Sequence, residues 1–532
     1  MQAASTPDTE PADSDPGVWH SDDTDSRDDT DDTDLPEPPG LDRFVDCAAG
    51  DGTGDGQTAT TAWRTLGRLA VEPLAPGATV RIARGSVCAG PLTVSGSGSA
   101  TAPIRVQAHG DGVDPIIDGT GLPAAVSLRD QSWITLSGLR ITGSTRWGVY
   151  VGSAAGAVKG ITLEDLEVHD VWGGAPDNKA TGLVVFTVEG EDAWFEDIDV
   201  HDVTAWNTDR WSGIFLYGVS WRTDGPRSAR VTFRDNVVHD VAGDGIVAFG
   251  TDDALLDGNL AYEVGGVPTD AIGTPNGIWT WDCRQCVVQW NEAHHVHSPT
   301  VDGGAFDIDW DTVDNVVQYN AGHDNDGYCV AVFAAEGSVT SGAVVRHNLC
   351  WNNGVAQARA YQGDLFLYTW NGGTLGDVQI YGNTVVRNSV HGYPPLIGWS
   401  EVGEGSGIWN NVFVVDGDWM ATVAGDVALG DNLWWQSSTQ GHAWYDDHAG
   451  GWSDGLSAWS AASGELGSLW QDPALTGGSG RAALRLKAGS PAIDAGRVVP
   501  GAGACDAFGG GVTGPPDIGA HEFGAVAAPE CG

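Results

Sequence analysis

Short runs of alternating apolar and polar residues recur through most of the chain, each followed by a turn that contains Asn or Asp. Stacked examples are ITLEDLEVHDV from Ile161, WFEDIDVHDV from Trp194, VTFRDNVVHDV from Val231, LLDGNLAYEV from Leu255, VVQWNEAHHV from Val287 and VVQYNAGHDN from Val316. In one register, the turn carries Asn236, Asn259, Asn291, Asn320, Asn348, Asn383, Asn411 and Asn432, 21 to 35 residues apart. Alternation with a period of two is typical of β-strands with one buried face.

The pattern predicts three short strands in each repeat unit of roughly 30 residues. The third strand of the unit begins with Gly, as in SGIFLYG, DGIVAFG and NGIWTWD. Such a unit buries its apolar face only by stacking on its neighbours, which favours a solenoid. A propeller is disfavoured because each blade needs four strands in ~40–45 residues. Asn tolerates the left-handed turn conformation, and its amide can bond the same amide one coil away. We therefore predict an all-β fold, a parallel β-helix.

Four segments are expected along the chain. Residues 1–40 contain 13 acidic residues and one Arg, which predicts a disordered acidic linker. It resembles the stalk of bacterial surface lipoproteins, so we expect that Met1 replaces a removed export signal. Residues 41–123 should form an N-terminal cap with a short amphipathic helix and the first coils, 124–435 the β-helix coils, and 436–532 a C-terminal capping region.

The two flanks of the repeat region carry a family resemblance. The opening DGTGDGQTATTAWRTLGRL and LAPGATVRIARG, and the closing GSPAIDAG and DIGAHEF, resemble the right-handed parallel β-helix proteins of the pectate-lyase-like superfamily, of the secreted bacterial type that acts on carbohydrates. The resemblance spans about Phe44 to Phe523. It implies a right-handed solenoid and a polysaccharide partner. The superfamily includes lyases, hydrolases, epimerases and non-catalytic adhesins, so the fold does not fix the chemistry.

The composition narrows the classes of molecule that this protein could bind. The chain has 532 residues, 77 Gly, 24 Trp and a formal net charge of −47. A solenoid grows along one axis, so we expect one elongated domain, and a monomer, despite this length. The acidity argues against nucleic acid and anionic membranes and disfavours polyanions at long range, although a local basic cleft would reverse that. Solubility alone also accounts for surface acidity. No stretch is long and apolar enough to span a bilayer.

The cysteines indicate export to an oxidising compartment, with the protein secreted or held at the cell surface. All eight can be paired as Cys47–Cys88, Cys283–Cys286, Cys329–Cys350 and Cys505–Cys531. We expect the third pair to join neighbouring coils. The CxxC of Cys283 and Cys286 could instead be half of a zinc site or a redox pair, but it lacks a second CxxC and a βαβ context, which favours a disulfide.

The Gly-led strands predict a ladder of outward side chains. If Ile214, Ile246, Ile278 and Phe306 face inward, then the outward positions are Phe215 and Tyr217, Val247 and Phe249, Trp279 and Trp281, and Asp307 and Asp309. Aromatic faces stack on sugar rings and carboxylates accept hydrogen bonds from hydroxyls, so this ladder predicts glycan subsites at Phe215, Tyr217, Trp279 and Trp281. The alternative is that these aromatics pack under a long loop.

A second pattern suggests β-elimination. Lys179, one of three lysines, stands three residues ahead of Gly182, and Arg210 stands three ahead of Gly213. A Lys beside a cation can act as a base, whereas Arg keeps its proton. Some alginate-lyase-like β-helix enzymes use a Lys base with an Arg one coil away, and the resemblance implies these roles for Lys179 and Arg210. The alternative is a surface ion pair with Asp177 or Asp209.

Histidines and aspartates gather between residues 291 and 327. One register position carries five histidines that we expect to stack in a column: His169, His201, His239, His294 and His323. Such a column is more typical of a hydrogen-bonded structural ladder than of a set of ligands. His295 and His297 leave that pattern and are candidate substrate contacts. They lie near Asp302, Asp307, Asp309 and Asp311, for which we predict a Ca²⁺ site, because oxygen sets favour Ca²⁺ and added imidazole favours Zn²⁺ or Mn²⁺.

The sequence therefore leaves three functions open. The first is a polysaccharide lyase that cleaves a uronic-acid-containing glycan, with Lys179 as base and Arg210 as the group that neutralises the carboxylate. The second is a glycoside hydrolase that uses Asp307 and Asp309, with Asp282 or Asp302, as paired carboxylates. The third is a non-catalytic, glycan-binding or adhesive surface solenoid.

Overall fold

The computed structural model describes residues 41–50, 52–176, 178–218, 225–267, 273–387, 391–398, 402–424, 427–437, 443–446, 450–528 and 531. The chain divides into two compact units, Met1–Pro39 and Gly40–Gly532. The predicted linker, residues 1–40, lies outside the described residues. Within the described ranges, no helix is both long and apolar enough to cross a membrane.

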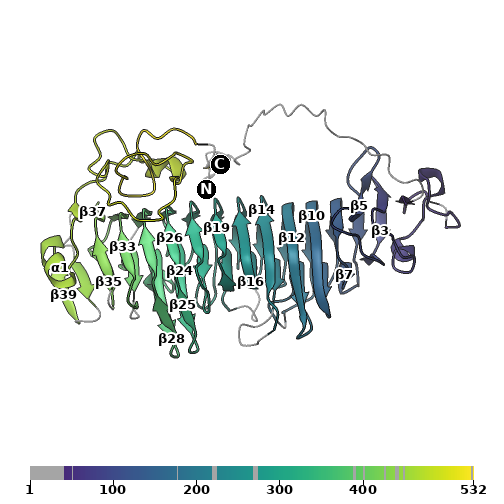
Figure 1. The fold of residues 1–532 in the computed structure, drawn as a ribbon, viewed down its shortest axis with the longest axis horizontal. Coiled ribbons are helices and arrows are strands. Elements are labelled where there is room, and N and C mark those ends of the chain that lie inside the picture. Colours follow the sequence, from purple (N-terminus) through teal and green to yellow (C-terminus); the bar gives the residue numbers. More distant parts are fainter. Residues whose placement is uncertain are drawn as a thin grey trace, which may run out of the picture. The chain divides into compact units, whose positions relative to one another are not determined.

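The unit from Gly40 onward is a parallel β-helix, whose coils place their strands in three parallel rows (Figure 1). The first row, which contains the Gly-led strands, consists of β4 (Leu92–Thr93), β7 (Ala124–Arg129), β9 (Trp147–Ser153), β11 (Gly182–Val188), β13 (Ser212–Tyr217), the start of β16 (Ile246–Asp257), β18 (Ile278–Arg284), β21 (Phe306–Ile308), β24 (Val330–Ala335), β28 (Leu365–Trp370), β32 (Leu396–Gly398), β35 (Trp419–Val423) and β38 (Ala443–Asp446).

The second row consists of β1 (Arg43–Val45), β2 (Thr79–Ala83), β5 (Ile104–His109), β8 (Ile134–Thr142), β10 (Gly156–Val171), β12 (Ala193–Thr208), β14 (Ser228–Arg234), the end of β16, β19 (Val287–Gln289), β22 (Val316–Gln318), β26 (Val344–Arg346), β30 (Gln379–Tyr381), β33 (Gly407–Trp409) and β36 (Ala428–Gly430). A short separate pair, β25 (Val339–Ser341) and β29 (Thr374–Gly376), lies between the first and second rows in sequence.

The third row consists of β3 (Val87–Ala89), β6 (Ile116–Asp118), the ends of β8, β10 and β12, β15 (Val237–Val241), β17 (Leu260–Val264), β20 (Glu292–His294), β23 (Ala321–His323), β27 (Leu349–Trp351), β31 (Thr384–Arg387), β34 (Val412–Val415), β37 (Leu433–Gln436) and β40 (Leu469–Trp470). The all-β solenoid predicted from the repeats is thus confirmed.

The core runs continuously through the coils because the same alternate positions face inward in each row. In the first row, Ile214 pairs with Ile246, Ile246 with Ile278, and Ile278 with Phe306, and all four are fully buried. The inward positions predicted for the Gly-led strands are therefore correct. A buried, stacked core of this kind is what stabilises a solenoid whose single coils cannot fold alone.

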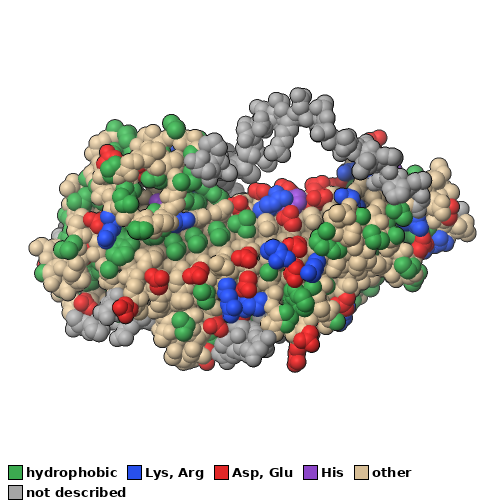
Figure 2. Space-filling model, viewed as in Figure 1, with side chains coloured by type: hydrophobic (Ala, Val, Ile, Leu, Met, Phe, Trp, Pro, Cys, Tyr) green, Lys and Arg blue, Asp and Glu red, His purple; other side chains and the backbone are tan. Residues whose placement is uncertain are grey.

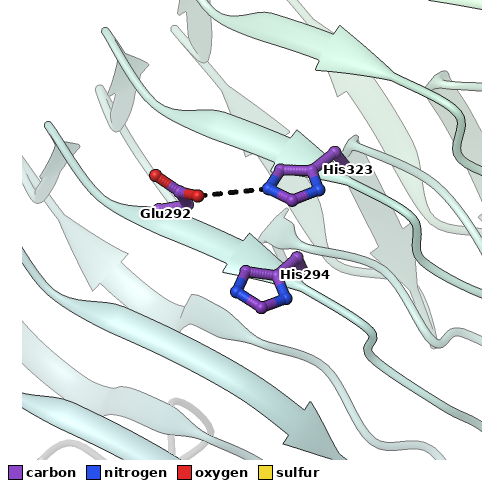
Figure 3. Close-up of side chains that lie close together, drawn as sticks. All are labelled: Glu292, His294 and His323. Carbon is purple, nitrogen blue, oxygen red and sulfur yellow. Dashed lines mark hydrogen bonds and ion pairs between the residues drawn. The ribbon is translucent and has the colours of Figure 1, made fainter. Parts of the chain in front are cut away.

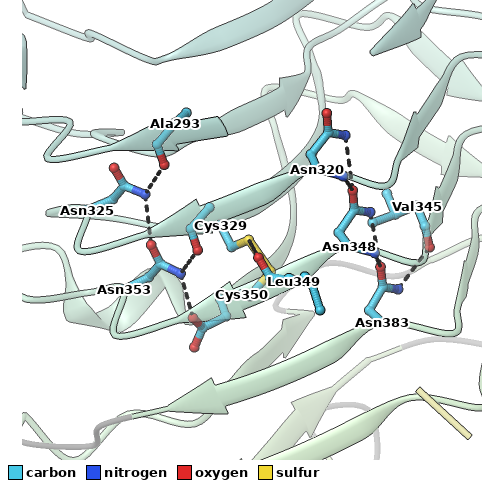
Figure 4. The surroundings of a disulfide bond; sticks show 12 residues. Ala293, Asn320, Asn325, Cys329, Val345, Asn348, Leu349, Cys350, Asn353 and Asn383 are labelled. Atoms are coloured by element: carbon cyan, nitrogen blue, oxygen red, sulfur yellow. Dashed lines mark hydrogen bonds between the residues drawn. A yellow bond between two sulfur atoms is a disulfide. The ribbon is translucent and has the colours of Figure 1, made fainter. Parts of the chain in front are cut away.

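An asparagine ladder fixes the turn between the second and third rows. Each side chain in the series Asn236, Asn259, Asn291, Asn320, Asn348, Asn383, Asn411 and Asn432 donates from Nδ2 to Oδ1 of the next at 2.9–3.0 Å. Figure 4 shows the part formed by Asn320, Asn348 and Asn383. Asn432 donates in turn to buried Glu465, which satisfies the last amide. The predicted amide ladder is confirmed.

All four predicted disulfides are present: Cys47–Cys88, Cys283–Cys286, Cys329–Cys350 and Cys505–Cys531. The CxxC is therefore neither a zinc half-site nor an open thiol pair. One detail differs from the expectation, because Cys329 and Cys350 lie at the start and end of a single coil, that of β24, β26 and β27, rather than in neighbouring coils (Figure 4).

The expected amphipathic helix near the N-terminal end is replaced by two 3₁₀ turns, η1 (Ala59–Thr61) and η2 (Leu66–Arg68). Between them, Trp63 leaves helical geometry and bonds the backbone of Phe44 and Asp46. The β-branched threonines and Gly67 in this segment also disfavour an α-helix. Its apolar side chains, such as Trp63 and Leu69, are nevertheless buried as the spacing indicated.

At the other end of the solenoid, α1 (Leu456–Ser463) packs beside β38 and β39 (Gly451–Asp454), with Trp444 and Trp459 buried. The following segment, which includes η4 (Arg481–Leu484), returns along the outside of the later coils (Figure 1). For example, the Ala520 N–H donates to Thr384 Oγ1 in β31 at 2.9 Å.

Candidate active site

The candidate site lies on the outer face of the first row, where the aromatic ladder meets two aspartates. Asp307 in β21 pairs with Trp279 in β18 on one side and with Ala331 in β24 on the other. Asp309 follows two residues later on the same face. The predicted register of outward positions, from Phe215 and Tyr217 through Trp279 and Trp281 to the two aspartates, is confirmed.

The aromatic part of this ladder is less exposed than predicted. Phe215, Phe249 and Trp279 are each at most 2 % exposed, whereas Tyr217 and Trp281 are half-buried. The rings cover one another, since the Phe249 and Trp281 centroids lie 4.3 Å apart and those of Tyr217 and Phe249 5.0 Å apart. Their role as sugar subsites stays a prediction, and Tyr217 and Trp281 offer the more accessible faces.

Further aromatic rings continue this surface past the aspartates. Trp310 stacks parallel to Trp281 with centroids 5.7 Å apart, and Trp370 lies 5.9 Å from Trp310. Tyr368 stacks on Trp370 at 5.7 Å. The aspartates are therefore bordered by aromatic rings from several coils, an arrangement suited to the apolar faces of sugar rings.

Three carboxyl groups, Asp302, Asp307 and Asp309, form what we call the carboxylate cluster. Burial raises the pKa of Asp302 to about 6 and the pKa of Asp309 to about 7. Burial, together with the charges of Asp309 and Asp302, also raises the pKa of Asp307 well above its usual range. Like charges in a poorly solvated place cannot all ionise at once, so part of the cluster holds protons near neutral pH.

The innermost carboxyl, that of Asp307, is held by groups from the two neighbouring coils. Asn276 Nδ2 and the Tyr328 hydroxyl each approach its Oδ2 at 3.4 Å, and the same hydroxyl donates to Asn276 Oδ1 at 2.9 Å. The Tyr328 ring passes over Gly304, where a Cβ atom would come within 2.0 Å of the ring. Gly304 is therefore required for Tyr328 to reach this position.

The one lysine at the site lies beside the cluster. Lys179 Nζ is 3.3 Å from Asp244 Oδ2 and lies over the rings of Trp279 and Trp211, 4.7 and 5.1 Å from their centroids. Trp211 Nε1 donates to the same Asp244 oxygen at 2.6 Å. The charge of Lys179 lowers the pKa of all three carboxyls of the cluster, so it offsets part of their burial.

Arg210, predicted to act with Lys179, points to a different part of the coil. Its guanidinium donates to the Gly174 carbonyl and to Asp209, and the residue is 4 % exposed. The predicted relation of Lys179 to Arg210 requires Gly182 to lie beside Gly213, but Gly182 pairs with Ser212. A shift of one residue reverses the side to which an extended residue points, which explains the different partners. The role predicted for Arg210 has no support in these contacts.

Asp282 lies in a separate ion pair. Arg227 Nη1 donates to its Oδ1 at 2.9 Å, and the residue is 1 % exposed. Burial raises the pKa of Asp282 to about 7 in spite of this arginine. It is less accessible than Asp302 and Asp309.

The predicted histidine contacts belong to the third row. His297 lies between Glu263 and Asp326, and exposed His295 contacts His294. The histidine column exists, but His201 is not in it, because His201 pairs with Glu164 and Arg234 in the second row. The stack is instead His169, Trp206, His239, Tyr262, His294, His323 and Trp351.

The four aspartates predicted to bind Ca²⁺ do not form a ready ligand set. Among the described residues, the group of three His, Cys, Asp or Glu ligand atoms within 4.8 Å of one another contains none of Asp302, Asp307, Asp309 and Asp311. Ca²⁺ takes six to eight oxygen ligands. Calcium binding here stays a prediction.

Sequence reasoning missed Asp244, Asn276 and Tyr328, which surround the cluster. Asp244 and Asn276 each stand two residues ahead of an inward isoleucine, Ile246 and Ile278, so one polar register position was visible in the repeats.

A cavity of about 410 Å³ lies away from the carboxylate cluster, between the second row and residues 497–501, and is lined in part by Arg346, Tyr381 and Trp409. On the face shown in Figure 2, Lys and Arg side chains lie among acidic ones.

Comparisons with known proteins agree with this architecture. Residues 212–392 match the family model described as "Right handed beta helix region". In an alignment 386 residues long, the sequence is 24% identical to a lacto-N-biosidase of Bifidobacterium longum subsp. longum. This match covers 53% of this chain and 24% of that protein. The chain therefore spans about a quarter of the length of this relative.

A solved structure gives a similar result. The GH136 lacto-N-biosidase from Eubacterium ramulus superimposes with a TM-score of 0.55 at 21% identity, over 65% of this chain and 64% of that one. Its selenomethionine derivative gives a TM-score of 0.53 at 22% identity. Likeness at this identity shows the fold alone. The chain is thus a right-handed parallel β-helix, as its sequence predicted, and its relatives are carbohydrate-active enzymes.

Proposed function

We propose that this protein is a glycoside hydrolase in which Asp302 and Asp309 form the acid and carboxylate pair. The observation that carries the proposal is the carboxylate cluster itself, in which the pKa of Asp302 is about 6 and that of Asp309 about 7. Hydrolysis of a glycosidic bond needs one carboxylic acid and one carboxylate on either side of the scissile bond. A carboxyl with an ordinary pKa of about 4 would be ionised at neutral pH and could not donate a proton.

Asp302 and Asp309 are the better pair because their carboxyls are more accessible than that of Asp307. Both are half-buried, whereas Asp307 is 2 % exposed and is bound by Asn276 and Tyr328. We assign Asp307 as a positioning residue, whose own pKa is raised by burial and by the charges of Asp309 and Asp302. Lys179 stabilises the member of the pair that is ionised.

The proposed reaction follows from this division of roles. The protonated carboxyl donates its proton to the glycosidic oxygen as the bond to the leaving sugar breaks. The ionised carboxylate either activates a water molecule, which attacks the sugar carbon directly, or attacks that carbon itself. In the second case a water molecule, deprotonated by the carboxylate that had donated its proton, then hydrolyses the glycosyl-enzyme. The separation of the two groups in the bound state decides between inversion and retention. Tyr217, Trp281 and Trp310 would stack on the sugars on either side of the bond.

For the substrate we propose glycans that carry a lacto-N-biose unit. The support is the likeness to proteins named lacto-N-biosidase. A neutral sugar also suits a chain with a net charge of −47, because it experiences no long-range repulsion. We place the protein outside the cytoplasm, since four disulfides are compatible with an oxidising compartment.

A polysaccharide lyase is less well supported. It would need Lys179 as base and a second cation at the substrate carboxylate, but Arg210 is engaged by Gly174 and Asp209. Three acidic side chains would also repel a uronate. A purely adhesive solenoid leaves the raised pKa values of the cluster without a role.

The test uses the variants Asp302→Asn and Asp309→Asn, with exposed Asp314→Asn of the same coil as the control. On an aryl lacto-N-bioside, we expect kcat/KM to fall by about 10²–10⁴-fold in the first two variants, with unchanged circular dichroism, and to stay near the wild-type value in the control. Added azide should restore turnover to one variant and not the other, which assigns the roles. Full activity in both variants would refute the pair.

A further inference from the structure

Outside the carboxylate cluster, the third row places three metal-ligating side chains together on its outer face. Glu292 and His294 are the first and last residues of β20, so both point to the same side of the strand. In the next coil, His323 of β23 pairs with His294. Figure 3 shows the Glu292 carboxylate and the two imidazole rings on one side of these neighbouring strands.

The ligand atoms of these residues converge. Glu292 Oε1 is 3.1 Å from His323 Nε2, and one ligand atom from each residue lies within 4.8 Å of the others. The two rings are stacked with centroids 4.8 Å apart. A small tilt of the His294 ring would bring the three atoms to the ~3.4 Å spacing that follows from Zn–N bonds of about 2.0–2.1 Å in a tetrahedron.

The outer nitrogen of each histidine is already held by a neighbour. His323 Nδ1 is 2.7 Å from Asp324 Oδ2, and His294 Nδ1 is 2.7 Å from His295 Nδ1. A carboxylate on the far nitrogen of a ligating imidazole orients the ring and raises its basicity. Elsewhere in the described column, histidines stack on Trp or Tyr, so His294 and His323 are the place where two imidazoles adjoin.

We propose that Glu292, His294 and His323 bind a divalent transition-metal ion, with Zn²⁺ as the best match. Two imidazoles and one carboxylate are a ligand set that suits Zn²⁺, whereas Ca²⁺ and Mg²⁺ prefer oxygen alone. The ion would tie together two neighbouring coils of the third row. Arg481 of the C-terminal segment is near enough for its charge to stabilise the Glu292 carboxylate, and metal binding would compete with this interaction.

This site is independent of the proposed hydrolase. Its ligands belong to the third row and the carboxylate cluster to the first, so loss of one leaves the other in place. A metal ion at Glu292, His294 and His323 needs no role in catalysis. Its binding can therefore be measured without an assay of hydrolysis.

The test is calorimetric titration of ZnCl₂ into the full chain, stripped with EDTA and free of any histidine tag. We expect one ion per chain and at least a tenfold loss of affinity in His294→Ala and in His323→Ala. The control is His239→Ala, which removes a ring from the same column but has Val237 instead of Glu two residues before it. Its affinity should match the wild type.

A second readout is the visible spectrum with Co²⁺ in place of Zn²⁺. Intense tetrahedral bands should appear in the wild type and in the His239→Ala variant and be lost in the His294→Ala variant. Absence of Zn²⁺ binding to the wild type, or binding of equal affinity and stoichiometry in His294→Ala and His323→Ala, would overturn the proposal.

Discussion

At the scale of single residues, the chemistry depends on side chains that come from different coils but share one patch. Asp302 and Asp309 belong to one coil, whereas Lys179 and Asp244 reach the site from earlier coils and Tyr328 from the next one. Burial raises the pKa of the two carboxyls, and Lys179 limits the rise. The site therefore contains both carboxyl groups that keep their protons and the positive charge of Lys179.

The raised pKa values predict how stability depends on pH. The ordinary carboxyl pKa of about 4 applies to the unfolded chain, and the folded values are about 6 for Asp302 and about 7 for Asp309. Between about pH 4 and pH 7 the folded state therefore binds more protons than the unfolded chain. The stability that these two carboxyls contribute is fully present below about pH 4 and is lost as the pH rises through 6 to 7.

We therefore expect the double variant Asp302→Asn with Asp309→Asn to equal the wild type in Tm near pH 4 and to exceed it by about 1–3 °C at pH 8. Thermal unfolding followed by circular dichroism at several pH values measures this difference. A Tm difference that does not grow with pH would show that the two carboxyls are not perturbed in this way.

Much of this site could be predicted from the sequence, and the remainder depends on contacts between coils. Asp307 and Asp309 could be placed beside Trp279 and Trp281 because the alternation within strands is strict. Tyr328 could not, since its position depends on the missing side chain of Gly304. The side to which Arg210 points could not be predicted either, because Gly182 pairs with Ser212 and not with Gly213, a difference of one residue in register.

At the scale of elements, the fold depends on ladders that run from coil to coil. Asn320 illustrates the requirement, because its Oδ1 accepts the Asn291 N–H at 2.9 Å and its Nδ2 donates to the Val288 carbonyl at 2.9 Å. These bonds satisfy buried backbone groups at a corner where the strands cannot pair. The repeated Asn made this ladder visible in the sequence.

We expect Asn320→Ala to lower the free energy of unfolding by about 3–5 kcal/mol, because it leaves several buried polar groups unpaired at about 1–3 kcal/mol each. Urea denaturation measures this loss. The control is half-buried Asn352→Gly, because Asn352 has φ 50° and glycine keeps this left-handed conformation without strain. The side chain of Asn352 donates to Asp324 on the outside of the coil, and its removal should cost less than about 1 kcal/mol. Equal losses in the two variants would show that the asparagine ladder does not contribute more to stability than an ordinary surface hydrogen bond.

At the scale of the whole molecule, a net charge of −47 acts against folding. Acidic groups on a compact body repel one another more than in the unfolded chain, and the effect is screened by salt. The four disulfides and the continuous core offset this repulsion. The same acidity leaves neutral glycans free to approach.

Raising the ionic strength should therefore stabilise the protein. Between about 0.01 and 0.1 M salt, where the screening length falls from about 30 to 10 Å, we expect Tm to rise by several degrees, equally with NaCl and choline chloride. Scanning calorimetry measures this. A constant or falling Tm over this range would mean that the acidic groups are spaced too widely to repel.

If the carboxylate cluster hydrolyses glycosidic bonds, a single incubation with a panel of glycans should reveal it. The full chain is mixed with lacto-N-biose-bearing glycans, other neutral glycans and polyuronates, while new reducing ends and the ultraviolet absorbance of a new C=C bond are followed together. We predict reducing ends from a lacto-N-biose-bearing glycan without new absorbance, and none with Asp309→Asn. Absorbance that rises with the reducing ends would contradict hydrolysis and establish elimination, and no reaction on any glycan would contradict both and favour a binding solenoid.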